Sequence, residues 1–398
     1  MKKICFINCA SSGSTGSLID NLSQFASNTF DSCFILGESL RDSSKRCLLI
    51  SHTKAKYIFH RIGTFFLGND GFLGGCVKKN VRNFLKTEKP NLIHIHNIHR
   101  SFCNLEIVLN YAKENNVPII WTLHDEWILT GRCCSFQQCS KWKEGCGHCS
   151  RKVLYPKSLF DCSSKFWHFK HNLINKFISY IHFVSPSKWL SDLVLNAYPN
   201  ARISVIRNGV NQSVFKISNK NKDILSLANG RSIIGCVAYN LSVDKGYDDI
   251  VKLSNLIDKK KTVVFVLGAN CKQAIEKIND GLYVVKQTSS KEEIASFYST
   301  IDVMFDPTKG DNYPTTHIEC LSCGTPFVTY DVGGAAESIT SKSSGFAVKK
   351  GDIQSALDKI MLVLNSGYDR NLILKDSKIH CFEHCLEQYL DLYKNKTN

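Results

Sequence analysis

The chain has 398 residues, with 50 Lys and Arg against 35 Asp and Glu, which gives a formal net charge of +15 at pH 7. Hydrophobic residues make up 43% and charged residues 21%, and there are only 8 Pro and 24 Gly. This composition excludes a mainly disordered, collagen-like or low-complexity chain, and the length predicts two or three domains.

The start of the chain is apolar but short. Ile4-Cys5-Phe6-Ile7 ends at Asn8, before the apolar core of a signal peptide would be complete. No stretch approaches the roughly 20 consecutive apolar residues that a membrane-spanning helix needs. We therefore expect a cytoplasmic protein whose 18 Cys are mostly reduced.

Short β-branched or aromatic runs alternate with amphipathic segments along the chain. The predicted strands are residues 3–8, 33–36, 92–96, 118–123, 182–185, 202–206, 233–238, 263–267, 282–285, 302–306 and 326–330. The predicted helices include residues 105–115, 187–197, 248–257 and 291–300. Strands that are apolar throughout, with helices between them, indicate parallel sheets covered on both faces, so the predicted fold class is α/β.

The alternation restarts after the turn at Asn208-Gly209 and the polar stretch 217–230. This restart predicts two doubly wound domains, residues 1–200 and 201–375, with a Cys-rich insertion at about 131–150 in the first. A ligand is expected between them, at the carboxyl ends of the strands.

Polar residues follow several strands of the first half. The turn Ser11-Ser12-Gly13-Ser14-Thr15-Gly16-Ser17 would let backbone approach a phosphate, but it lacks the G-x-G-x-x-G spacing and is equally an ordinary strand-to-helix turn. His94 and His96 are more typical of satisfied core side chains than of a metal site. His124 also ends a predicted strand, where residues of a binding crevice belong.

The Cys-rich insertion has the spacing of a metal site. Cys146-x-x-Cys149 is typical of a metal knuckle, and Cys139 with Cys133 or Cys134 would complete four thiolates. Structural zinc on Cys133, Cys139, Cys146 and Cys149, free thiols, and a disulfide all stay open. No open nitrogen or oxygen ligand accompanies the thiols, so we expect no catalytic zinc here.

Two carboxylates, Asp311 and Glu319, stand eight residues apart around a predicted helix start. Such groups accept hydrogen bonds from sugar or ribose hydroxyls, and the N–H groups of residues 313–315 would receive phosphate oxygens. The alternative is a helix whose acidic start is favoured by the helix dipole.

Asp311–Glu319, followed by Cys323-Gly324-Thr325-Pro326 and Asp331-Val332-Gly333-Gly334, resembles the carboxyl-terminal signature of family 4 glycosyltransferases. Asp-Asn-x-Pro, in place of a first Glu, is similar to the exopolysaccharide and colanic-acid branch. Lys245-Gly246 agrees, and the resemblance covers nearly the whole chain. One departure is Asn240, which stands where the family usually has Arg to contact the diphosphate.

The resemblance implies a retaining enzyme of the GT-B fold, with two Rossmann-like domains facing a central cleft and no catalytic metal. It would move a sugar from a UDP- or GDP-sugar to a lipid-linked glycan acceptor, in the synthesis of a surface polysaccharide or capsule. The end of the chain, 376–398, would form a helix that packs back on the first domain. The implied site residues are Lys245 for the diphosphate, Glu319 for the ribose, Asp311, Tyr313, Pro314 and Thr315 for the donor, and Gly16 and His124 near the donor sugar.

Asn240 and Asp311 also keep a second reading open, a non-catalytic scaffold or glycan-binding protein of the same shape. A phosphorylase or epimerase would need a different phosphate site, and the sequence shows none.

Residues 41–100 contain 12 Lys and Arg against 3 Asp and Glu, interleaved with Tyr57-Ile58-Phe59 and Phe65-Phe66-Leu67. This mixture predicts a peripheral protein that docks on anionic lipid at the cytoplasmic face of the membrane. A solvated basic face is the alternative. No nucleic-acid-binding motif accompanies the charge, so we expect no nucleic-acid partner.

Overall fold

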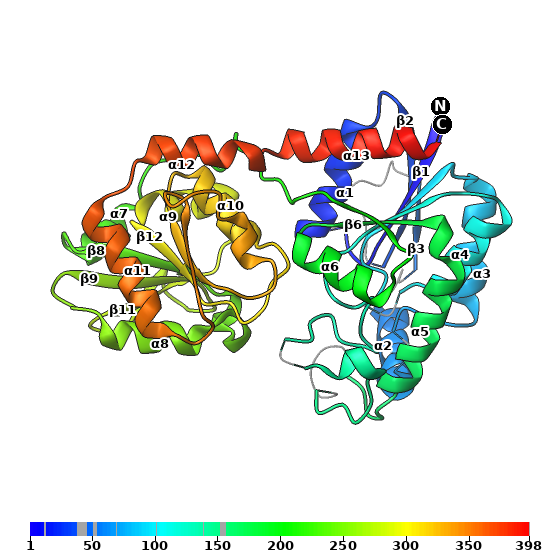
Figure 1. The fold of residues 1–398 in the computed structure, drawn as a ribbon, viewed down its shortest axis with the longest axis horizontal. Helices are drawn as coiled ribbons and strands as arrows, with labels where there is room; N and C mark the ends of the chain where they lie inside the picture. Colours follow the sequence, from blue (N-terminus) through cyan, green and yellow to red (C-terminus); the bar gives the residue numbers. More distant parts are fainter. Residues whose placement is uncertain are drawn as a thin grey trace. The chain divides into compact units, whose positions relative to one another are not determined.

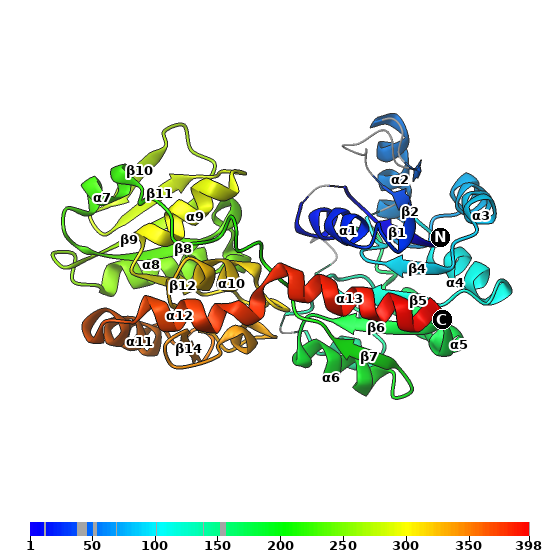
Figure 2. The same cartoon turned by 90° about the horizontal axis from the view of Figure 1, so that it is seen from above.

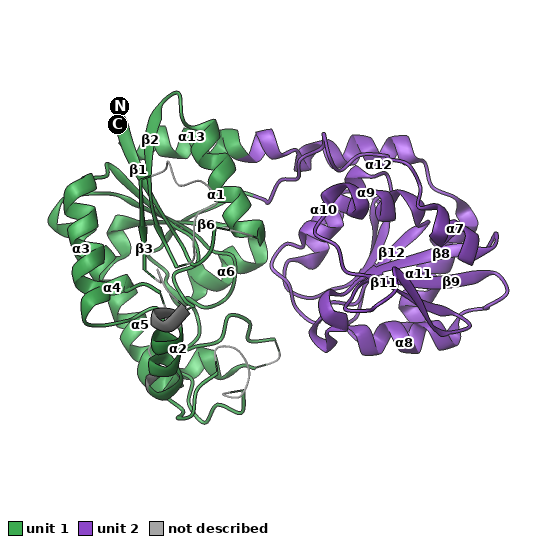
Figure 3. Cartoon of the chain, turned by 180° about the vertical axis from the view of Figure 1, so that it is seen from behind, with its two compact units in different colours: residues 1–206, 386–398 green, residues 207–385 purple. Residues whose placement is uncertain are grey.

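The computed structural model describes residues 1–11, 13–37, 46–50, 54–68, 70–100, 102–137, 139–151 and 157–397. Some predicted features fall outside this set: Ser12 of the Ser- and Gly-rich turn, residues 41–45 of the basic segment, the side chains of Tyr57 and Leu67, and Gln138 of the Cys-rich insertion. The described chain forms two compact units (Figure 3). Unit 1 is Met1–Ile206 with Leu386–Asn398, and unit 2 is Arg207–Cys385.

Unit 1 is built on a seven-stranded sheet with the order β3-β2-β1-β4-β5-β6-β7, in which all neighbouring strands are parallel. Figure 2 shows β1, β4, β5, β6 and β7 following one another across the unit. The strands are β1 (Lys2–Asn8), β2 (Phe30–Leu36), β3 (Cys47–Leu49), β4 (Leu92–Ile95), β5 (Ile119–Thr122), β6 (Ile181–Ser185) and β7 (Arg202–Val205). The helices are α1 (Gly13–Phe25), α2 (Lys54–Leu67), α3 (Cys76–Glu88), α4 (Leu105–Glu114), α5 (Ser163–Phe177) and α6 (Lys188–Ala197).

Unit 2 repeats this plan. Its sheet has the order β10-β11-β9-β8-β12-β13-β14, and its neighbours are parallel except for β10 and β11. The strands are β8 (Ser232–Val237), β9 (Thr262–Ala269), β10 (Ile275–Asn279), β11 (Leu282–Lys286), β12 (Val303–Asp306), β13 (Phe327–Tyr330) and β14 (Gly345–Val348). The helices are α7 (Lys222–Ala228), α8 (Tyr247–Leu256), α9 (Lys291–Thr300), α10 (Thr315–Ser322), α11 (Ile353–Ser366) and α12 (Arg370–Ser377).

Local sequence explains why these elements begin where they do. Asn104 precedes α4, and its side chain accepts a hydrogen bond from the backbone of Ile107. Ser187 does the same for Leu190 at the start of α6. Such caps satisfy backbone donors that have no partner inside the helix. The central strands are buried along almost their whole length, as parallel strands covered by helices must be.

The last helix, α13 (Phe382–Thr397), begins in unit 2 and ends in unit 1 (Figure 1). Two buried tyrosines hold its second half in unit 1. The Tyr393 hydroxyl lies 2.8 Å from Nδ1 of His94, and the Tyr389 hydroxyl lies 2.9 Å from Oγ1 of Thr122. Thr122 Oγ1 in turn lies 2.9 Å from Nε2 of His94. His94 is therefore a satisfied core residue.

Among the described residues, no helix is long and apolar enough to cross a membrane.

Candidate active site

Each sheet has one point where the strand order reverses, between β1 and β4 in unit 1 and between β8 and β12 in unit 2. We call these the switch points. In sheets of this topology ligands bind outside the carboxyl ends of the strands at the switch point, because the adjacent loops leave in opposite directions there. Predicted site residues follow these strands in both units.

At the unit 2 switch point a lysine and an aspartate form an ion pair. Lys245 ends η4 (Val243–Lys245), in the loop after β8, and its Nζ lies 2.8 Å from Oδ2 of Asp311, which follows β12. Both side chains stay partly open to solvent, at 41% and 23% exposure. Burial lowers the pKa of the Lys245 ammonium, but the carboxylates of Asp311 and Asp306 outweigh burial and hold this pKa above its ordinary value. A permanent positive charge thus stands at the end of the sheet.

Two glycines fix the backbone on either side of this pair. Gly246 has a φ of 77°, and a Cβ there would lie 2.1 Å from the carbonyl oxygen of Pro307. Gly333 has a φ of 59°, and a Cβ there would lie 2.2 Å from the carbonyl oxygen of Asp311. Only glycine tolerates both the left-handed conformation and the contact. The Lys-Gly and Gly-Gly motifs are therefore packing requirements that hold Lys245 and Asp311 in place.

A buried carboxylate that the sequence analysis did not single out lies behind the pair. Asp306 ends β12, and its Oδ2 lies 2.8 Å from Nε2 of His317 on α10. Burial raises the pKa of the Asp306 carboxyl, but the hydrogen bond from His317 and the charge of Lys245 hold it below its ordinary value. Its position as the last residue of an otherwise apolar strand was the available signal. Asp306 adds a second negative charge that keeps Lys245 protonated.

Glu319, on the second turn of α10, is a half-buried carboxyl with few charged neighbours. The Tyr298 hydroxyl donates to its Oε2 at 3.3 Å, and the Thr315 hydroxyl also hydrogen-bonds to it. Burial raises the pKa of Glu319 to about 7, although these two hydrogen bonds and Lys291 act against the rise. A carboxylate has about four lone-pair sites, so beside these two donors it can accept hydrogen bonds from two neighbouring hydroxyls.

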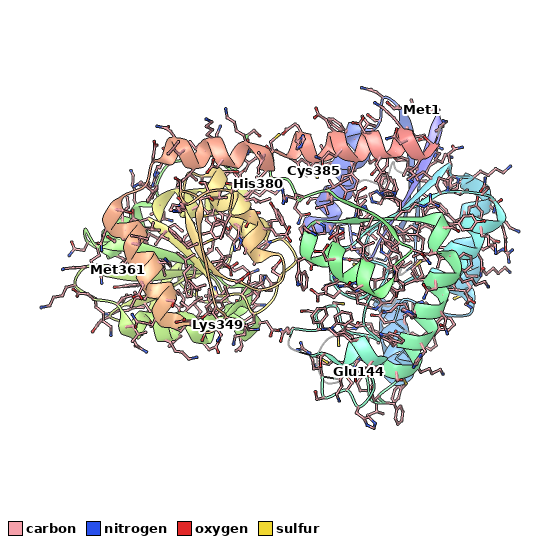
Figure 4. The ribbon with its side chains drawn as sticks, viewed as in Figure 1. Met1, Glu144, Lys349, Met361, His380 and Cys385 are labelled. Atoms are coloured by element: carbon pink, nitrogen blue, oxygen red, sulfur yellow. The ribbon has the colours of Figure 1, made fainter. Side chains whose placement is uncertain are left out.

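At the segment before α10, the backbone is available to a ligand, whereas the side chain of Tyr313 is not. The Tyr313 ring is buried, and its hydroxyl lies 3.2 Å from Nδ1 of His380, which is labelled in Figure 4. Pro314 precedes the helix, and no side chain caps the helix start. The first N–H groups of α10, beginning at Thr315, therefore lack an intrahelical partner and can receive an anion.

Asn240, the departure noted in the sequence, lies in an exposed turn with a φ of 51° and a ψ of 29°. Asn tolerates this left-handed conformation better than most residues because its short amide can hydrogen-bond locally. The turn geometry thus accounts for an asparagine there.

At the unit 1 switch point, Gly16 lies in the first turn of α1. A Cβ at Gly16 would lie 2.4 Å from the carbonyl carbon of Ser11 and 2.5 Å from its oxygen. Asn8, at the end of β1, donates to the carbonyl of Ala10 at 2.7 Å and accepts from the backbone of Asn97 at 3.1 Å. Because Gly16 has no side chain, the start of α1 can pack against the backbone of Ser11. The two hydrogen bonds of Asn8 connect this turn to the segment after β4.

Histidines gather at the ends of β4 and β5. His124 Nε2 lies 2.9 Å from Nδ1 of His96. Burial lowers the pKa of His124 to about 4, with Asp125 acting against the fall and His99 adding to it, and burial and the neighbouring His94 hold the pKa of His96 well below its ordinary value. His124 is therefore neutral near pH 7. At that pH its side chain can form hydrogen bonds but carries no positive charge.

One further group of possible metal ligands occurs among the described residues. His99 Nε2 lies 2.7 Å from Oδ2 of Asp125, and Cys134 Sγ lies 3.7 Å from both ring nitrogens of His99. Burial lowers the pKa of His99, but the Asp125 carboxylate reverses this and raises it. The Lys170 amine lies 3.5 Å from the centroid of the Trp127 ring, and burial lowers its pKa to about 7, although Cys134, Cys146 and Asp125 act against the fall. Against burial, which raises the pKa of Asp125, the His99 imidazole thus serves as the partner that holds this pKa below its ordinary value.

The four predicted zinc ligands lie around one cavity, lined by Cys133, Cys139, Cys146 and Cys149 with neighbouring basic residues. Among the described residues, no three of these sulfur atoms lie within 4.8 Å of one another.

Two protein families match the chain. The family described as Glycosyltransferase Family 4 matches residues 51–214, and the one described as Glycosyl transferases group 1 matches residues 218–378. A putative colanic acid biosynthesis glycosyl transferase, WcaC of Escherichia coli, is 25% identical over 87% of this chain and 86% of its own length. A Campylobacter jejuni N,N'-diacetylbacillosaminyl-diphospho-undecaprenol alpha-1,3-N-acetylgalactosaminyltransferase is 22% identical over 37% of this chain and 41% of its own.

Solved structures match over the full length. Sucrose-phosphate synthase from Thermosynechococcus elongatus superposes with a TM-score of 0.69 at 13% identity and covers 99% of both chains. HepE of Anabaena in complex with UDP-glucose superposes with a TM-score of 0.66 at 14% identity, covering 99% of this chain and 100% of its own. The predicted GT-B fold class is confirmed.

Proposed function

Because the chain belongs to glycosyltransferase family 4, we propose that it moves a sugar from a nucleotide-diphosphate-sugar to a glycan acceptor, with retention of configuration, in the synthesis of a bacterial-type surface polysaccharide. The chain is a glycosyltransferase by both families that match it. The relative from Escherichia coli supports polysaccharide synthesis as the setting. The observation that carries the donor side is the Lys245–Asp311 ion pair at the unit 2 switch point.

Unit 2 binds the donor. The Lys245 ammonium pairs with the diphosphate, since a compact charge on a flexible stem can leave Asp311 and follow the phosphates. The first N–H groups of α10, from Thr315, receive phosphate oxygens, with Pro314 beside them. Asp311, once released from Lys245, accepts hydrogen bonds from the sugar hydroxyls. Tyr313 contributes its backbone, because its ring is buried.

Glu319 binds the ribose. Its carboxylate accepts one hydrogen bond from each of two adjacent hydroxyls. The two hydroxyls of a ribose have this arrangement. The complex of HepE with UDP-glucose makes uridine diphosphate sugars the first donors to test, ahead of GDP-sugars.

Unit 1 supplies the acceptor side. Neutral His124 hydrogen-bonds a sugar hydroxyl, and the tight α1 turn at Gly16 presents backbone N–H groups at the unit 1 switch point. Retention needs no protein nucleophile here. The acceptor hydroxyl attacks the face that the diphosphate leaves, and a departing phosphate oxygen takes its proton. The chain contributes positioning and charge stabilisation.

The acceptor is lipid-linked and the protein docks on an anionic membrane surface. Helix α2 exposes a row of large apolar side chains, which we call the α2 patch: Ile58, Phe59, Ile62, Phe65 and Phe66. The segment with exposed Leu159 and Phe160 joins it, since the Leu159 N–H donates to the carbonyl of Phe65 at 2.8 Å. Aromatic side chains in a strongly basic protein favour insertion among anionic head groups. The Campylobacter jejuni relative, named for an undecaprenol-linked substrate, supports this class of acceptor.

A donor screen tests the transferase. Purified protein is incubated with UDP-, GDP- and dTDP-sugars, with and without a lipid extract, and released nucleotide is measured. We expect release from one donor, at least about 100-fold lower in Lys245→Met. If no donor releases nucleotide and no nucleotide shifts the melting temperature, a non-catalytic scaffold would be the better-supported function.

Vesicle sedimentation tests the membrane role. We expect binding to vesicles of phosphatidylglycerol but not of phosphatidylcholine, and about tenfold weaker binding in Phe59→Ser, because one exposed Phe contributes about 1.5–3 kcal/mol when buried. Leu372→Ser is the matched control, since Leu372 is a similarly exposed apolar residue on α12. Equal loss in both variants, or no binding to either lipid, would remove this part of the proposal.

A further inference from the structure

The Cys-rich segment folds as a small knob on unit 1, residues 131–151 with Gln138 outside the described chain; we call it the Cys knob. Glu144, labelled in Figure 4, belongs to it. Among the described residues of the knob, the one large apolar side chain that is buried is Trp142, which stacks on Phe136 with ring centroids 5.0 Å apart. Phe136 in turn lies 6.0 Å from the ring of Trp189 on α6. Two aromatic contacts are a small core for a segment of this length.

Four cysteines fill the part of the knob that the aromatic residues leave open. Cys133, Cys139, Cys146 and Cys149 line one cavity of about 30 Å³. The Cys133 and Cys149 thiols hydrogen-bond to each other. The backbone N–H of Gly131 donates to Cys146 Sγ at 3.3 Å. An N–H aimed at sulfur is the kind of contact that stabilises a thiolate, the form that binds metal.

A buried arginine points to negative charge in the same cavity. Arg132 is only 6% exposed and lines the cavity with the four cysteines. Within the described part of the chain its buried Nη1 has no hydrogen-bond partner. A buried guanidinium N–H without an acceptor costs free energy. Lys141 and Arg151 line the cavity as well, so the surroundings of the four cysteines are cationic.

The structure also separates Cys133 from Cys134, which the sequence left as alternatives. Cys134 turns away from the cavity towards His99 and Asp125, with its Sγ 3.7 Å from the His99 ring nitrogens. Cys134 does not line the cavity, and Cys133 does. The neighbours along the chain thus have different roles, and the complete set is Cys133, Cys139, Cys146 and Cys149.

We propose that Cys133, Cys139, Cys146 and Cys149 bind a structural Zn²⁺ that holds the Cys knob together. Four soft thiolates in a closed set suit tetrahedral zinc, with Zn–S distances of about 2.3 Å. Since no three of these sulfurs in the described chain lie within 4.8 Å of one another, binding draws them inward. Binding releases the protons of those cysteines that are still thiols to solvent and leaves a complex with a charge of −2, which the positive charges of Arg132, Lys141 and Arg151 offset.

The zinc would also order residues next to the proposed acceptor site. The carbonyl of Cys134 accepts from the backbone N–H of Glu126 at 3.0 Å, and Thr130 Oγ1 donates to the carbonyl of Cys133 at 2.6 Å. These bonds connect the knob to the loop that follows His124. The zinc is therefore a support for that loop and takes no part in the transfer reaction.

Metal content of the full chain tests the proposal. We expect about one zinc per chain in protein purified under reducing conditions, less than about one-fifth of that in Cys149→Ser, and no loss in Cys134→Ser, the matched control beside a ligand. If Cys149→Ser does not fold, the zinc content of the wild-type chain still tests the proposal. Cobalt added to metal-stripped protein should give the absorption of tetrahedral cobalt bound to four thiolates.

Three results would overturn the proposal. Wild-type protein could carry no zinc and give no thiolate–cobalt absorption. Alkylation followed by mass spectrometry could show a Cys133–Cys149 disulfide in the native chain. Cys134→Ser could lose as much zinc as Cys149→Ser, which would place the metal on another set of ligands.

Discussion

The two switch points share a topology but differ in chemistry. In unit 2 the loops after β8 and β12 bring together charged groups, Lys245 paired with Asp311 and Asp306 behind them. In unit 1 the ends of β4 and β5 present histidines instead, and burial keeps the side chains of His96 and His124 neutral. The same backbone plan can thus bind a charged diphosphate at one point and neutral sugar hydroxyls at the other. Side chains at strand ends decide which.

The largest expected effect lies at the charged switch point. Lys245→Met should lower kcat/KM for the donor by about 100- to 1,000-fold, because the charge that stabilises the departing diphosphate is lost. Lys252→Met is the control, since Lys252 is an exposed lysine on α8 paired with Asp249 at 2.8 Å. Steady-state kinetics with varied donor measure both. Equal effects in the two variants would mean that Lys245 contributes only general surface charge.

Next in size is Gly246→Ala, which tests whether the turn that presents Lys245 is a packing requirement. The φ of 77° and the 2.1 Å approach to Pro307 should lower the free energy of unfolding by about 2–3 kcal/mol. Gly230→Ala isolates the dihedral cost, because Gly230 has a φ of 79° and no atom within 4 Å of its Cβ position. Denaturant unfolding that gives the two variants the same loss would contradict the packing account.

Glu319→Gln should separate donor binding from stability. With a folded pKa of about 7 against an ordinary value of 4.5, the folded state holds more protons than the unfolded state between these values, so stability falls as pH rises through this window. Gln removes that cost. We expect the variant to melt higher than wild type at pH 8 while it binds donor about 10- to 100-fold more weakly. A lower melting temperature at pH 8 would argue against the raised pKa.

The same pKa predicts a difference in pH dependence between donor and acceptor. Because ribose binding needs the ionised carboxylate, donor affinity should fall about tenfold per pH unit below about 7 and stay level above it. His124, with a pKa of about 4, should leave the acceptor KM level from pH 6 to 8. Profiles of the two KM values check this. An acceptor KM that titrates near pH 6.5 would show that His124 carries charge.

The smallest effect expected is that of His124→Gln. An amide can replace a neutral imidazole as a hydrogen-bonding group, so kcat/KM should fall by about two- to tenfold, corresponding to at most one ordinary hydrogen bond. A loss as large as that of Lys245→Met would erase the contrast between the two switch points.

Much of the fold follows from sequence because parallel strands buried on both faces are continuous apolar runs. Each predicted strand is present, and the predicted helix 291–300 coincides with α9. The strands that were missed lie towards sheet edges: β3 has three residues, β10 is a largely polar antiparallel strand, and β14 is partly exposed. Edge strands lack the two-sided burial that produces the signal.

The sequence predicted which positions form the candidate site, but it predicted less about the chemical surroundings of those residues. Motif spacing identified Lys245, Asp311 and Glu319, but their surroundings depend on residues far away in sequence. Asp306 and His317 come together only through packing. The buried Tyr313 ring shows the same limit, because its partner His380 lies 67 residues away along the chain.

Calorimetry of nucleotide binding tests the central claim most directly. UDP and GDP, without any sugar or acceptor, are titrated into wild type, into the double variant Lys245→Met with Glu319→Gln, and into His124→Gln. The charged switch point of unit 2 predicts that one nucleotide binds to wild type and to His124→Gln alike, and that the double variant binds at least about 100-fold more weakly. Undiminished binding in the double variant, or its loss in His124→Gln, would contradict the account.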